Sequence, residues 1–587
     1  MSDESHTTSP PPLTIFEDDH LLVIDKPAGM NTHSPSAFAG EGIYDRLRHR
    51  EPRWAGLAII QRLDKETSGV LIFSKSPAAN RSLTQQFAGH SVRKKYLLLT
   101  DRPVRRTEFT AVSALVRSGE KYVSRPLHAG AAKAETRFRV RTLEDGMTLV
   151  EAEPVTGRTH QIRVHAAEHG FPILGDTLYG GTPAQRVFLH SEELVIDHPV
   201  TGVPTEFRAT ANFGLWTLDF GPALDFGPGM NLRHALIDPQ VTNAYRLLHG
   251  AADGWPGWYV DRLGEYLLSQ SEQPLSSRQT QFLEKLVPAI LGPRSRQIET
   301  RGAGRTADRK LAGEMAGGTP ALLSTFRGAY HRIVKRSTSP VIETSSQHVL
   351  GETAPDRFLV QENGLNFELS FDEGCSVGLF LDQRDNRRRF LIQHVAAGFP
   401  LLPGSQRRAS SGGGVEVLNM FAYTCGFSVC AAKAGARTTN VDLSKKYLEW
   451  GKRNFIANQI DPAEHEFLHG DAFDWLRRLA RKKRAFDVVI LDPPTFSRSK
   501  GRGTFQVEKD YGKLVAAALP LVRPQGVLFA ATNAATWRPE EFLATISEAI
   551  HSAKRKIIQQ HYAPQPPDFP IVRAEPAYLK TVWVRIE

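Results

Sequence analysis

The segment from residue 415 onward alternates between apolar runs and helical stretches, and this alternation constrains the fold more than any other feature of the chain. Four strands, at 416–421, 438–441, 467–468 and 486–491, are predicted with helices between them, at 427–434, 445–459 and 472–481. Such alternation builds a parallel, doubly wound sheet that binds ligands at the carboxyl ends of its strands. The sequence therefore predicts a Rossmann-like domain with a ligand site at one sheet edge.

Three acids, Asp442, Asp471 and Asp492, lie at that edge. An acid after the second strand can accept both hydroxyl groups of a nucleoside ribose, although each acid taken singly is as often a helix N-cap. Gly426 in the first loop permits close approach of the backbone to a ligand. The Gly-x-Gly-x-x-Gly fingerprint is absent, which weakens the alternative of a nucleotide-dependent oxidoreductase.

The chain is too long for a single core. At 587 residues, and with roughly 100–200 residues per domain, it should contain three or four domains. Its net charge of +10 favours a polyanionic partner, because neutralising phosphates provides affinity. The three cysteines lack metal-ligand spacing, so no metal is expected. Residues 1–11 should be disordered, and without a signal peptide or membrane span the protein is expected to be cytoplasmic.

In the first half of the chain, Asp64 lies between two apolar runs, 57–60 and 70–73, with a Thr-Ser-Gly turn at 67–69. An acid between two buried strands invites a catalytic interpretation. The alternative is an ordinary loop ion pair between Asp64 and Arg62, since structural pairs also perturb acids.

A second polar stretch, 155–165, is predicted to form a strand. Alternation with Ile162 and Val164 would make Gln161, Arg163 and His165 project from one face. An arginine aimed at a cleft could hold Asp64 ionised and also bind a phosphate. The alternative is a solvated edge strand whose arginine forms a surface pair worth ~0–1 kcal/mol.

Four ordered motifs lie within residues 12–214: Arg62-Leu63-Asp64 with Thr67-Ser68-Gly69, Lys94-Lys95-Tyr96, the 157–163 stretch, and Gly175-Asp176-Thr177-Leu178-Tyr179-Gly180. With Lys26-Pro27-Ala28-Gly29 and His198-Pro199 near the ends, they resemble the ribosomal large-subunit pseudouridine synthase A family. The resemblance implies an α+β domain with a mixed antiparallel sheet. The family has histidine where this chain has Gln61, which affects substrate positioning and leaves the acid in place.

The resemblance implies cofactor-free isomerisation of uridine to pseudouridine in RNA. Asp64 would attack the ribose anomeric carbon or the pyrimidine ring, with Arg163 as its ion-pair partner. Tyr96 would stack on the unstacked base and take part in removing the proton from the product carbon. Substrate-binding roles fall on Arg62, Arg158, His160 and Gln161. Family members often carry an S4 RNA-binding domain, whereas only a dozen residues precede this domain, so target selection is expected from the catalytic domain or from the segments C-terminal to it.

A further set of motifs covers about residues 240–587: Asp253-Gly254-x-Pro256-Gly257, Phe380-Leu381-Asp382-Gln383-Arg384-x-Asn386-Arg387, Asn419-x-Phe421-x-Tyr423-Thr424-x-Gly426, Asp492-Pro493-Pro494-Thr495-Phe496 and Tyr578-Leu579-Lys580. This set resembles class I S-adenosylmethionine-dependent methyltransferases, and more narrowly the rRNA large-subunit methyltransferases of the I and K types. The resemblance implies a linker at 215–239, a small α/β RNA-binding or accessory domain at 240–375 and a methyltransferase domain at 376–587.

By resemblance, Asp442 would bind the cofactor ribose and Asp471 the adenine amine, and the other cofactor-binding residues would be Asn419, Phe421, Tyr423, Gly426 and Asp492. Asp492, also catalytic, would form the acceptor pocket with Pro493, Pro494 and Phe496. The I type methylates cytosine C5 with a cysteine on the strand that here spans 527–534 and contains none. A guanine ring nitrogen of 23S rRNA is therefore favoured, with 5-methylcytosine as the alternative.

Several features remain open at this level. Residues 244–250 are predicted to be a short helix, 294–318 a flexible or RNA-contacting basic loop, and 403–414 a mobile spacer. The leading hypothesis is a bifunctional enzyme acting on 23S rRNA or a pre-ribosomal particle, with tRNA as the alternative substrate. A chain in which one half has become an RNA-binding module is the other hypothesis, and the oligomeric state is undetermined.

Overall fold

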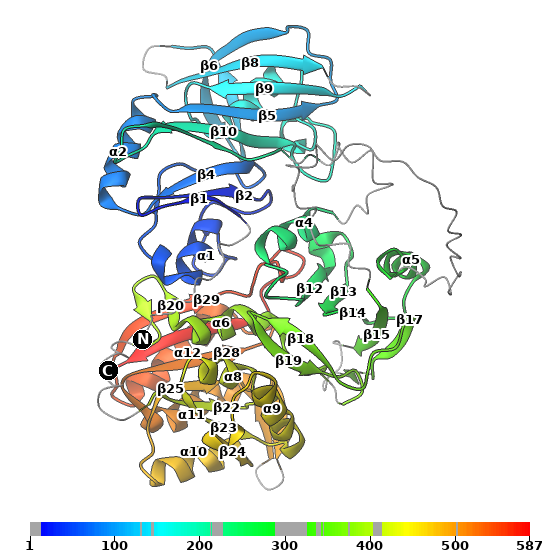
Figure 1. Ribbon diagram of the computed structural model, residues 1–587, viewed down its shortest axis with the longest axis vertical. Helices are drawn as coiled ribbons and strands as arrows, with labels where there is room; N and C mark the ends of the chain where they lie inside the picture. The colour runs from blue at the N-terminus through cyan, green and yellow to red at the C-terminus, as the bar shows by residue number, and fades with distance from the viewer. Residues whose placement is uncertain are drawn as a thin grey trace, which may run out of the picture.

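The computed structural model describes residues 13–128, 132–142, 146–211, 213, 227–287, 326–335, 342–343, 345–373, 376–402, 414–499 and 503–587. Two large bodies lie one above the other, and a third part, drawn in green, flanks them on one side (Figure 1). The predicted disorder at 1–11, the 294–318 loop and nearly all of the 403–414 spacer lie outside the described residues.

The N-terminal body is built on one eleven-stranded sheet with the order β1-β2-β4-β10-β5-β9-β8-β6-β7, to which β3 and β11 add at β4 and β10. Only the β4–β10 pair is parallel, so the described strands form the mixed antiparallel sheet that the sequence predicted. Its elements are β1 (Thr14–Glu17), β2 (Leu21–Lys26), α1 (Ile43–Arg50), β3 (Ala58–Ile59), β4 (Ser68–Ser74), α2 (Pro77–Ala88), β5 (Arg93–Thr100), β6 (Glu108–Ser118), β7 (Lys121–Arg125), β8 (Lys133–Thr142), β9 (Thr148–Pro154), α3 (Gln161–Glu168), η2 (Thr177–Tyr179), β10 (Leu189–Asp197) and β11 (Pro204–Arg208).

Gly69 allows the parallel contact between β4 and β10. It has a φ of 108°, and an added Cβ would lie 2.2 Å from the carbonyl oxygen of Ser191. Only glycine fits such a close approach of two backbones. Ser191 is in turn the register partner of Tyr96 on β5, so the glycine of the Asp64 loop brings that loop next to the strand that carries Tyr96.

The predicted strand at 155–165 is wrong, because the chain forms α3 from Gln161. His160 adopts the left-handed conformation, with a φ of 55°, and starts the helix. Residues 161–166 are all buried, so polar and apolar side chains alike face the protein interior. In a helix buried on every side the hydrophobic pattern does not report the period, and the apparent alternation was a coincidence.

The middle part is a six-stranded sheet of mainly antiparallel strands in the order β12-β13-β14-β15-β16, with β17 paired to β15. Its elements are α4 (Gly227–Leu236), β12 (Ala244–His249), η3 (Gly250–Asp253), β13 (Trp258–Leu263), β14 (Tyr266–Ser271), α5 (Ser277–Leu286), β15 (Gly328–Lys335), β16 (Ile342–Glu343) and β17 (Gln347–Gly351). The predicted short helix at 244–250 is wrong: β12 is a strand whose residues are all buried, so a uniform apolar run could not reveal the strand period.

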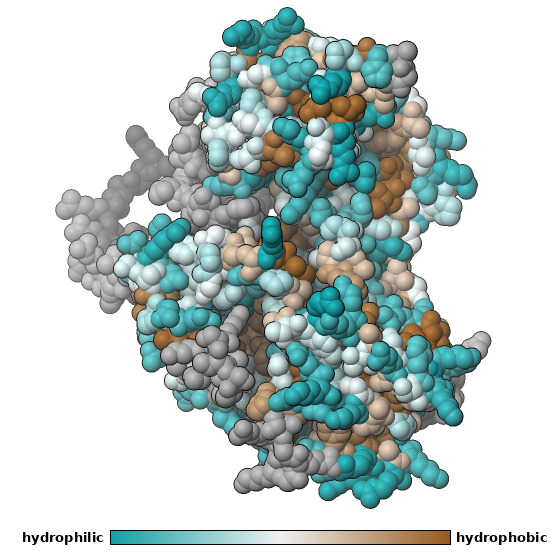
Figure 2. Space-filling view, turned by 180° about the vertical axis from the view of Figure 1, so that it is seen from behind, coloured by the Kyte–Doolittle hydropathy of each residue, from teal (hydrophilic) through white to brown (hydrophobic). Residues whose placement is uncertain are grey.

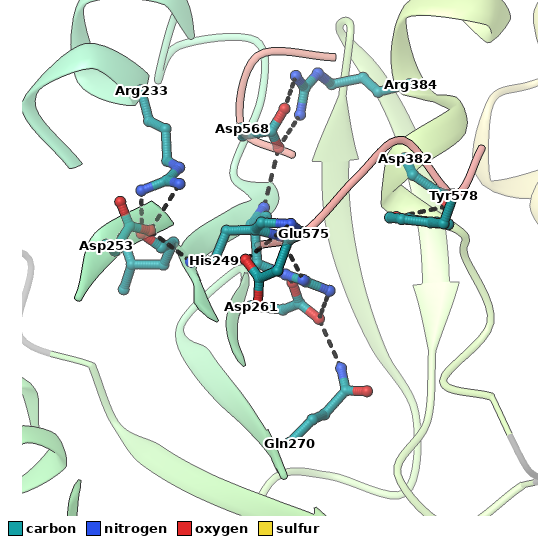
Figure 3. Close-up of polar contacts among 12 residues, drawn as sticks. Arg233, His249, Asp253, Asp261, Gln270, Asp382, Arg384, Asp568, Glu575 and Tyr578 are labelled. Carbon is teal, nitrogen blue, oxygen red and sulfur yellow. Dashed lines mark hydrogen bonds and ion pairs between the residues drawn. The ribbon is translucent and has the colours of Figure 1, made fainter. Parts of the chain in front are cut away.

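The predicted linker at 215–239 contains a helix. Arg233 on α4 forms an ion pair with Asp253 at 2.8 Å and donates to the carbonyl of Leu247 at 3.1 Å. Since Arg233 is buried, these contacts fix α4 against β12 and η3 (Figure 3). This part of the segment therefore belongs to the middle sheet.

The C-terminal body is a seven-stranded sheet in the order β24-β23-β22-β25-β28-β30-β29. The first five strands run parallel, β30 runs antiparallel to β28, and β29 runs antiparallel to β30, which confirms the doubly wound prediction. Its elements are β18 (Phe358–Glu362), β19 (Leu365–Leu369), η4 (Leu381–Gln383), α6 (Arg384–Ile392), β20 (His394–Ala396), β21 (Phe399–Pro400), β22 (Glu416–Met420), α8 (Gly426–Lys433), β23 (Arg437–Asp442), α9 (Lys445–Ala457), β24 (Glu466–His469), α10 (Ala472–Arg481), β25 (Phe486–Leu491), β26 (Phe496–Ser499), β27 (Gly503–Gln506), α11 (Val507–Ala518), β28 (Val522–Thr532), α12 (Pro539–Ser552), β29 (Ile557–Ala563) and β30 (Lys580–Ile586).

The middle part and the C-terminal body share one hydrophobic core. A single buried cluster runs from Ala244 and Leu263 of the middle sheet to Val417 and Trp583 of the C-terminal sheet. The predicted boundary near 375 therefore separates two sheets that one buried cluster joins, and each part also has a buried cluster of its own.

The N-terminal and C-terminal bodies touch through α1, which lies over α6, β20 and β29 (Figure 1). Arg46 of α1 pairs with Asp385 of α6 at 2.6 Å, and Arg388 pairs with Glu51 at 2.5 Å. The ring of His394 contacts the carbonyl oxygen of Arg48 at 2.9 Å. These partly buried ion pairs fix how the two bodies sit together.

The surface is mainly hydrophilic, with hydrophobic residues gathered in small separate patches on the face seen in Figure 2. Among the described residues, no helix combines the length and the apolar character needed to cross a membrane.

Candidate active sites

Asp64 lies in the loop between β3 and β4, and its backbone is held in place from both sides. Its carbonyl accepts from the amide of Thr67 at 3.1 Å. The preceding residue, Leu63, exchanges two hydrogen bonds with the Thr32 hydroxyl, at 2.9 and 3.1 Å. The Asp64 side chain keeps 24% of its surface exposed, so the acid is fixed and open to a ligand.

Lys26, at the end of β2, holds the same loop through hydrogen bonds to backbone carbonyls. It is fully buried, and its Nζ donates to the carbonyls of Met30 at 2.7 Å, Pro27 at 2.9 Å and Lys65 at 3.4 Å. Burial lowers the pKa of Lys26 to about 7, and the charges of nearby acids, Asp64 among them, oppose this shift. The Lys-Pro-Ala-Gly motif marked Lys26 in the sequence, but its hydrogen-bonding role was not predicted.

Arg163 reaches Asp64 from α3, with its Nη1 3.6 Å from Asp64 Oδ2. Its strongest partner is Asp176, which accepts two hydrogen bonds, at 2.7 and 2.8 Å. Burial alone would lower the pKa of Arg163, but the hydrogen bond to Asp176 and the charges of Asp176, Asp64 and Glu66 raise it. The sequence analysis placed Asp176 in a motif and missed this role.

Arg62, the other candidate partner of Asp64, is exposed. Among the described residues, the basic side chains within ion-pair distance of Asp64 are those of Arg163 and His160. The simple loop pair between Arg62 and Asp64 is therefore not what the structure contains.

Tyr96 and His160 complete the surroundings of Asp64. Tyr96 is buried on β5. Burial and the charge of Asp64 raise its pKa to about 12, against the opposing effect of a hydrogen bond with Ser191. His160 lies 3.9 Å from Asp64 and contacts the Tyr179 hydroxyl at 2.7 Å, and burial lowers its pKa. Tyr96 is thus neutral at physiological pH.

Gln161 does not face this site. Its amide oxygen accepts from Thr156 at 2.7 Å and from the backbone of Arg158 at 3.0 Å, and its nitrogen donates to Glu135 and Thr136, both at 2.9 Å. Because Gln161 is buried and its amide is used within the protein, it shapes the loop before α3. Arg158 is exposed, although its Nε donates to the Lys133 carbonyl at 3.3 Å, so it remains free to reach a ligand with its other nitrogens.

The second site lies at the carboxyl ends of β22, β23 and β25, where the strand order reverses. The loop after β22 has three non-glycine residues in the left-handed conformation: Phe421, Tyr423 and Cys425, with φ of 61°, 49° and 62°. Each such residue costs on the order of 1–3 kcal/mol and persists where its surroundings fix it, often at a functional site. Here Ala422 donates to the Val441 carbonyl at 2.9 Å, which ties the loop to β23.

Asp442 ends β23 and holds this loop. Its two carboxylate oxygens accept from the backbone amides of Tyr423 and Ser444, both at 2.8 Å, and burial raises its pKa. Asp471 caps α10 by accepting from the amide of Asp474 at 3.1 Å. One of its carboxylate oxygens therefore has the helix N-cap role that the sequence analysis gave as the alternative.

Two predicted cofactor-binding residues are used for packing. Asn419 is buried and donates to Ser428 at 2.8 Å. Gly426 is the first residue of α8, and an added Cβ would lie 3.2 Å from Cδ of Arg387 and 3.4 Å from a methyl carbon of Leu379. The glycine therefore gives room to the neighbouring α6 and its preceding loop.

Asp492 follows β25, across β22 from Asp442. Gln383 donates to it at 3.1 Å, and Asn386 of α6 holds Gln383 with a hydrogen bond of 2.8 Å. Burial and the charge of Asp382 raise the pKa of Asp492 to about 7, with Arg387 and Gln383 opposing the shift. The supporting role of Gln383 was missed because the two residues lie far apart in the sequence.

The remaining predicted acceptor residues line the same edge. Pro493 is buried, Pro494 is exposed and Phe496 keeps 40% of its surface exposed. Lys580, whose Nζ donates to the carbonyls of Ala534 at 2.6 Å and Tyr578 at 3.1 Å, has a pKa lowered to about 8 by burial. It was part of a sequence motif without a predicted role.

Buried polar contacts join the middle sheet to this site (Figure 3). Arg384 forms two hydrogen bonds with Asp568, at 2.8 and 2.6 Å, and Tyr578 donates to Asp382 at 3.0 Å. Asp568 also accepts from the backbone of Arg246 on β12 at 3.1 Å. The site edge is therefore braced by the middle part of the chain.

Both the N-terminal and the C-terminal part of the chain are similar to known proteins. Residues 20–168 match the RNA pseudouridylate synthases, and residues 330–585 match the S-adenosylmethionine-dependent methyltransferases. Ribosomal large subunit pseudouridine synthase C of Escherichia coli is 37% identical over 216 residues, covering 34% of this chain and 67% of the relative. The corresponding Yersinia pestis protein is 40% identical, with 33% of this chain and 64% of the relative covered.

The longer match is to a ribosomal RNA large subunit methyltransferase of Deinococcus radiodurans, 29% identical over 398 residues, or 66% of this chain and 82% of the relative. A solved structure of a methyltransferase complexed with SAH is 26% identical, covers 61% of this chain and 79% of its own, and has a TM-score of 0.46.

The fold and the two sites define an enzyme with two catalytic units, one for pseudouridine formation and one for methyl transfer. The chain belongs to the RNA pseudouridylate synthase family through its N-terminal body, and its C-terminal body contains an S-adenosylmethionine-dependent methyltransferase domain.

Proposed function

We propose that the N-terminal body, within residues 12–214, isomerises uridine to pseudouridine in large-subunit ribosomal RNA, with Asp64 as the nucleophile. The observation that carries this proposal is the partly exposed Asp64 carboxylate 3.6 Å from the fixed guanidinium of Arg163. A guanidinium at this distance orients the carboxylate that attacks the substrate. Relatives named as ribosomal large subunit pseudouridine synthases support the RNA class.

The reaction requires the bond between the ribose and base N1 to break, the base to rotate, and a bond to form between the ribose and base C5. Asp64 attacks the ribose anomeric carbon or the pyrimidine ring and is released when the new carbon–carbon bond forms. The C5 proton then leaves and N1 gains a proton. Tyr96, which burial keeps neutral, is placed to stack on the rotated base and to assist that proton transfer. The reaction needs no cofactor.

Asp64→Asn tests this proposal. We expect the variant to abolish tritium release from RNA labelled at uracil C5 while RNA binding stays intact, because only the nucleophile is lost. Glu66→Gln is a matched control, since Glu66 is on the same loop and 3.4 Å from Arg163. It should retain most of the activity. Normal release by Asp64→Asn would refute the assignment.

We propose that the C-terminal body, about residues 376–587 with the 240–375 part as an accessory RNA-binding domain, methylates a guanine ring nitrogen in 23S rRNA. Asp442 and Asp492 end two strands on either side of the strained 421–425 loop, and this pairing carries the proposal. Bound S-adenosylmethionine supplies an electrophilic methyl group. In this proposal Asp442 binds the ribose of the cofactor and Asp492 accepts hydrogen bonds from the base.

The 5-methylcytosine alternative requires a nucleophilic thiolate. β28 contains no cysteine, and the two described cysteines, Cys425 and Cys430, are buried with pKa values raised by burial. A protonated, buried thiol is a poor nucleophile. Direct transfer to a ring nitrogen needs only positioning of the base against the methyl group, so guanine is the better-supported substrate.

Two measurements test the methyltransferase proposal. Titration calorimetry of S-adenosylmethionine into Asp442→Ala should show a large loss of affinity, and unchanged affinity would remove the proposed ribose site. Mass-spectrometric mapping of rRNA and tRNA from a deletion strain should show a lost pseudouridine and a lost methylguanine in 23S rRNA. A lost 5-methylcytosine, or losses confined to tRNA, would instead support the alternatives.

A further inference from the structure

A carboxylate and two imidazoles meet where the N-terminal body rests on the C-terminal body. Glu41 precedes α1, His49 lies on α1, and His561 lies on β29. Each residue offers one ligand atom, and the three atoms lie within 4.8 Å of one another. Within the described ranges, this is the group of histidine, cysteine and acidic residues whose spacing suits a metal ion.

The contacts within the group leave one nitrogen unused. Glu41 Oε1 lies 2.8 Å from His49 Nδ1, and the rings of His49 and His561 meet edge to face with centroids 4.6 Å apart. The Nε2 atom of His561 is buried and has no hydrogen-bond partner among the described residues. Leaving a buried polar atom unpaired costs about 1–3 kcal/mol, which indicates that a partner belongs at this place.

We propose that Glu41, His49 and His561 bind a zinc ion that joins the two catalytic bodies. Two imidazoles with one carboxylate form a common zinc ligand set, and a water molecule would take the fourth position. Zinc bonds of about 2.0–2.2 Å place tetrahedral ligand atoms roughly 3.3 Å apart. The ligand atoms, which lie within 4.8 Å of one another, therefore need to close by up to about 1.5 Å around the ion.

Arg389 of α6 lies behind the carboxylate and fits the role of an outer partner. Its Nη2 is 3.7 Å from Glu41 Oε1, and it is fixed by hydrogen bonds to the Val395 carbonyl at 2.9 Å and to Asn386 at 3.3 Å. Carboxylate ligands are commonly oriented by such hydrogen-bonded neighbours. Its positive charge also opposes a cation, so we expect weaker binding than in a site without an arginine.

This proposal departs from the expectation of no metal that was drawn from the cysteine pattern. The ligands come from opposite ends of the chain and from two different folds, so no local spacing could reveal them. Because Glu41 and His49 come from one body and His561 from the other, the ion would stabilise their contact and not either active site.

The test uses the full chain without an affinity tag, treated with a chelator and then titrated with zinc chloride. We expect about one zinc per chain, measured by calorimetry and by elemental analysis, and an increase in thermal stability. His49→Ala, His561→Ala and Glu41→Gln should each weaken binding at least about tenfold. His551→Ala is the matched control, since His551 is exposed on the last turn of α12 and should bind zinc as the wild type does.

Tritium release and S-adenosylmethionine binding report whether each variant has folded in both bodies. If a ligand variant fails to fold, X-ray absorption at the zinc edge of the wild type gives an independent answer. Two imidazoles and one carboxylate around zinc support the proposal, whereas sulfur ligands overturn it. Absence of bound zinc in the wild type, or equal binding by the ligand variants, also overturns it.

Discussion

Single buried charges set the pH behaviour of the methyltransferase site. Asp492 accepts a hydrogen bond from a base N–H more strongly when it is ionised, and its pKa is raised to about 7 by burial and by Asp382. Methyl transfer should therefore increase as the pH rises through about 7 and level off above it. Asp492→Asn should be weakly active with a flat profile. Single-turnover rates between pH 5.5 and 8.5 give the measurement, and a wild-type profile without a step near 7 would contradict this role.

The same carboxyl group should lower the free energy of unfolding as the pH rises, whereas it raises the rate of methyl transfer. Its pKa is raised on folding, so its contribution is fully present below the ordinary value of 3.8 and is lost as the pH rises through about 7. We expect Asp492→Asn to be more stable than the wild type at pH 8 by roughly 1–3 kcal/mol, with no gain at pH 4. Urea unfolding at the two pH values measures the difference; a gain at both would point to a packing effect.

Lys26 holds the loop that carries Asp64 through hydrogen bonds to three backbone carbonyls. Lys26→Met should remove the donors to the Met30, Pro27 and Lys65 carbonyls and release the loop that carries Asp64. We expect pseudouridine formation to fall at least about tenfold, since small misplacement of a catalytic group is costly. Methyl transfer by the same variant is the internal control and should be unchanged. Equal loss of both activities would indicate general misfolding.

Among helices and strands, sequence patterns predicted those elements that have one face toward the protein interior and the other toward water. Helices such as α10, which has a polar and an apolar face, were predicted with their observed bounds. The 155–165 and 244–250 segments were assigned to the wrong type because α3 and β12 are buried on all sides. The hydrophobic period of a sequence reveals a helix or a strand only where one face is buried and the other is exposed to water. Neither segment has such an exposed face.

The candidate sites follow the same logic. Asp64, Arg163, Asp442 and Asp492 were predicted because their motifs are local. Their supports were not, since Asp176 and Gln383 act on them through contacts formed only on folding. The hydrogen bond from Asn419 to Ser428 had the same limit, because nothing in the sequence revealed that its amide faces Ser428; the cofactor role of Asn419 stays a prediction.

Helix α6 depends on a buried ion pair. Arg384 and Asp568 share two hydrogen bonds and are both buried. Arg384→Met would leave the Asp568 carboxylate without its charge partner, which costs about 3–5 kcal/mol. The unfolding transition of the C-terminal body is the one that S-adenosylmethionine shifts to higher urea. We expect Arg384→Met to lower the urea midpoint of this transition. The double variant Arg384→Met with Asp568→Leu should recover much of the lost stability. A double variant no more stable than the single one would show that the pair itself is net stabilising.

At the scale of the whole molecule, two enzymes share one framework. α6 binds α1 on one side through Asp385 and Arg388, and the Gln383 that precedes it supports Asp492 on the other. On the N-terminal side, the residue Thr32 that binds the Asp64 loop also accepts, through its carbonyl, from the amide of Tyr44 on α1. A change at the α1–α6 contact therefore has a physical route to both active sites.

Charge reversal tests this contact. Arg46→Asp places a carboxylate against Asp385 at a partly buried contact, and like charges there are unfavourable. We expect the two bodies to separate, with a larger radius of gyration in solution scattering, faster cleavage between the bodies by a protease, and a moderate loss of methyl transfer. Asp385→Arg added to Arg46→Asp should restore all three, because it reforms the pair with reversed charges. Arg53→Asp is the control, since its partner Glu17 lies within the N-terminal body. If Arg46→Asp stays compact while losing methyl transfer, α6 responds to the charge directly and the coupling does not need separation of the bodies.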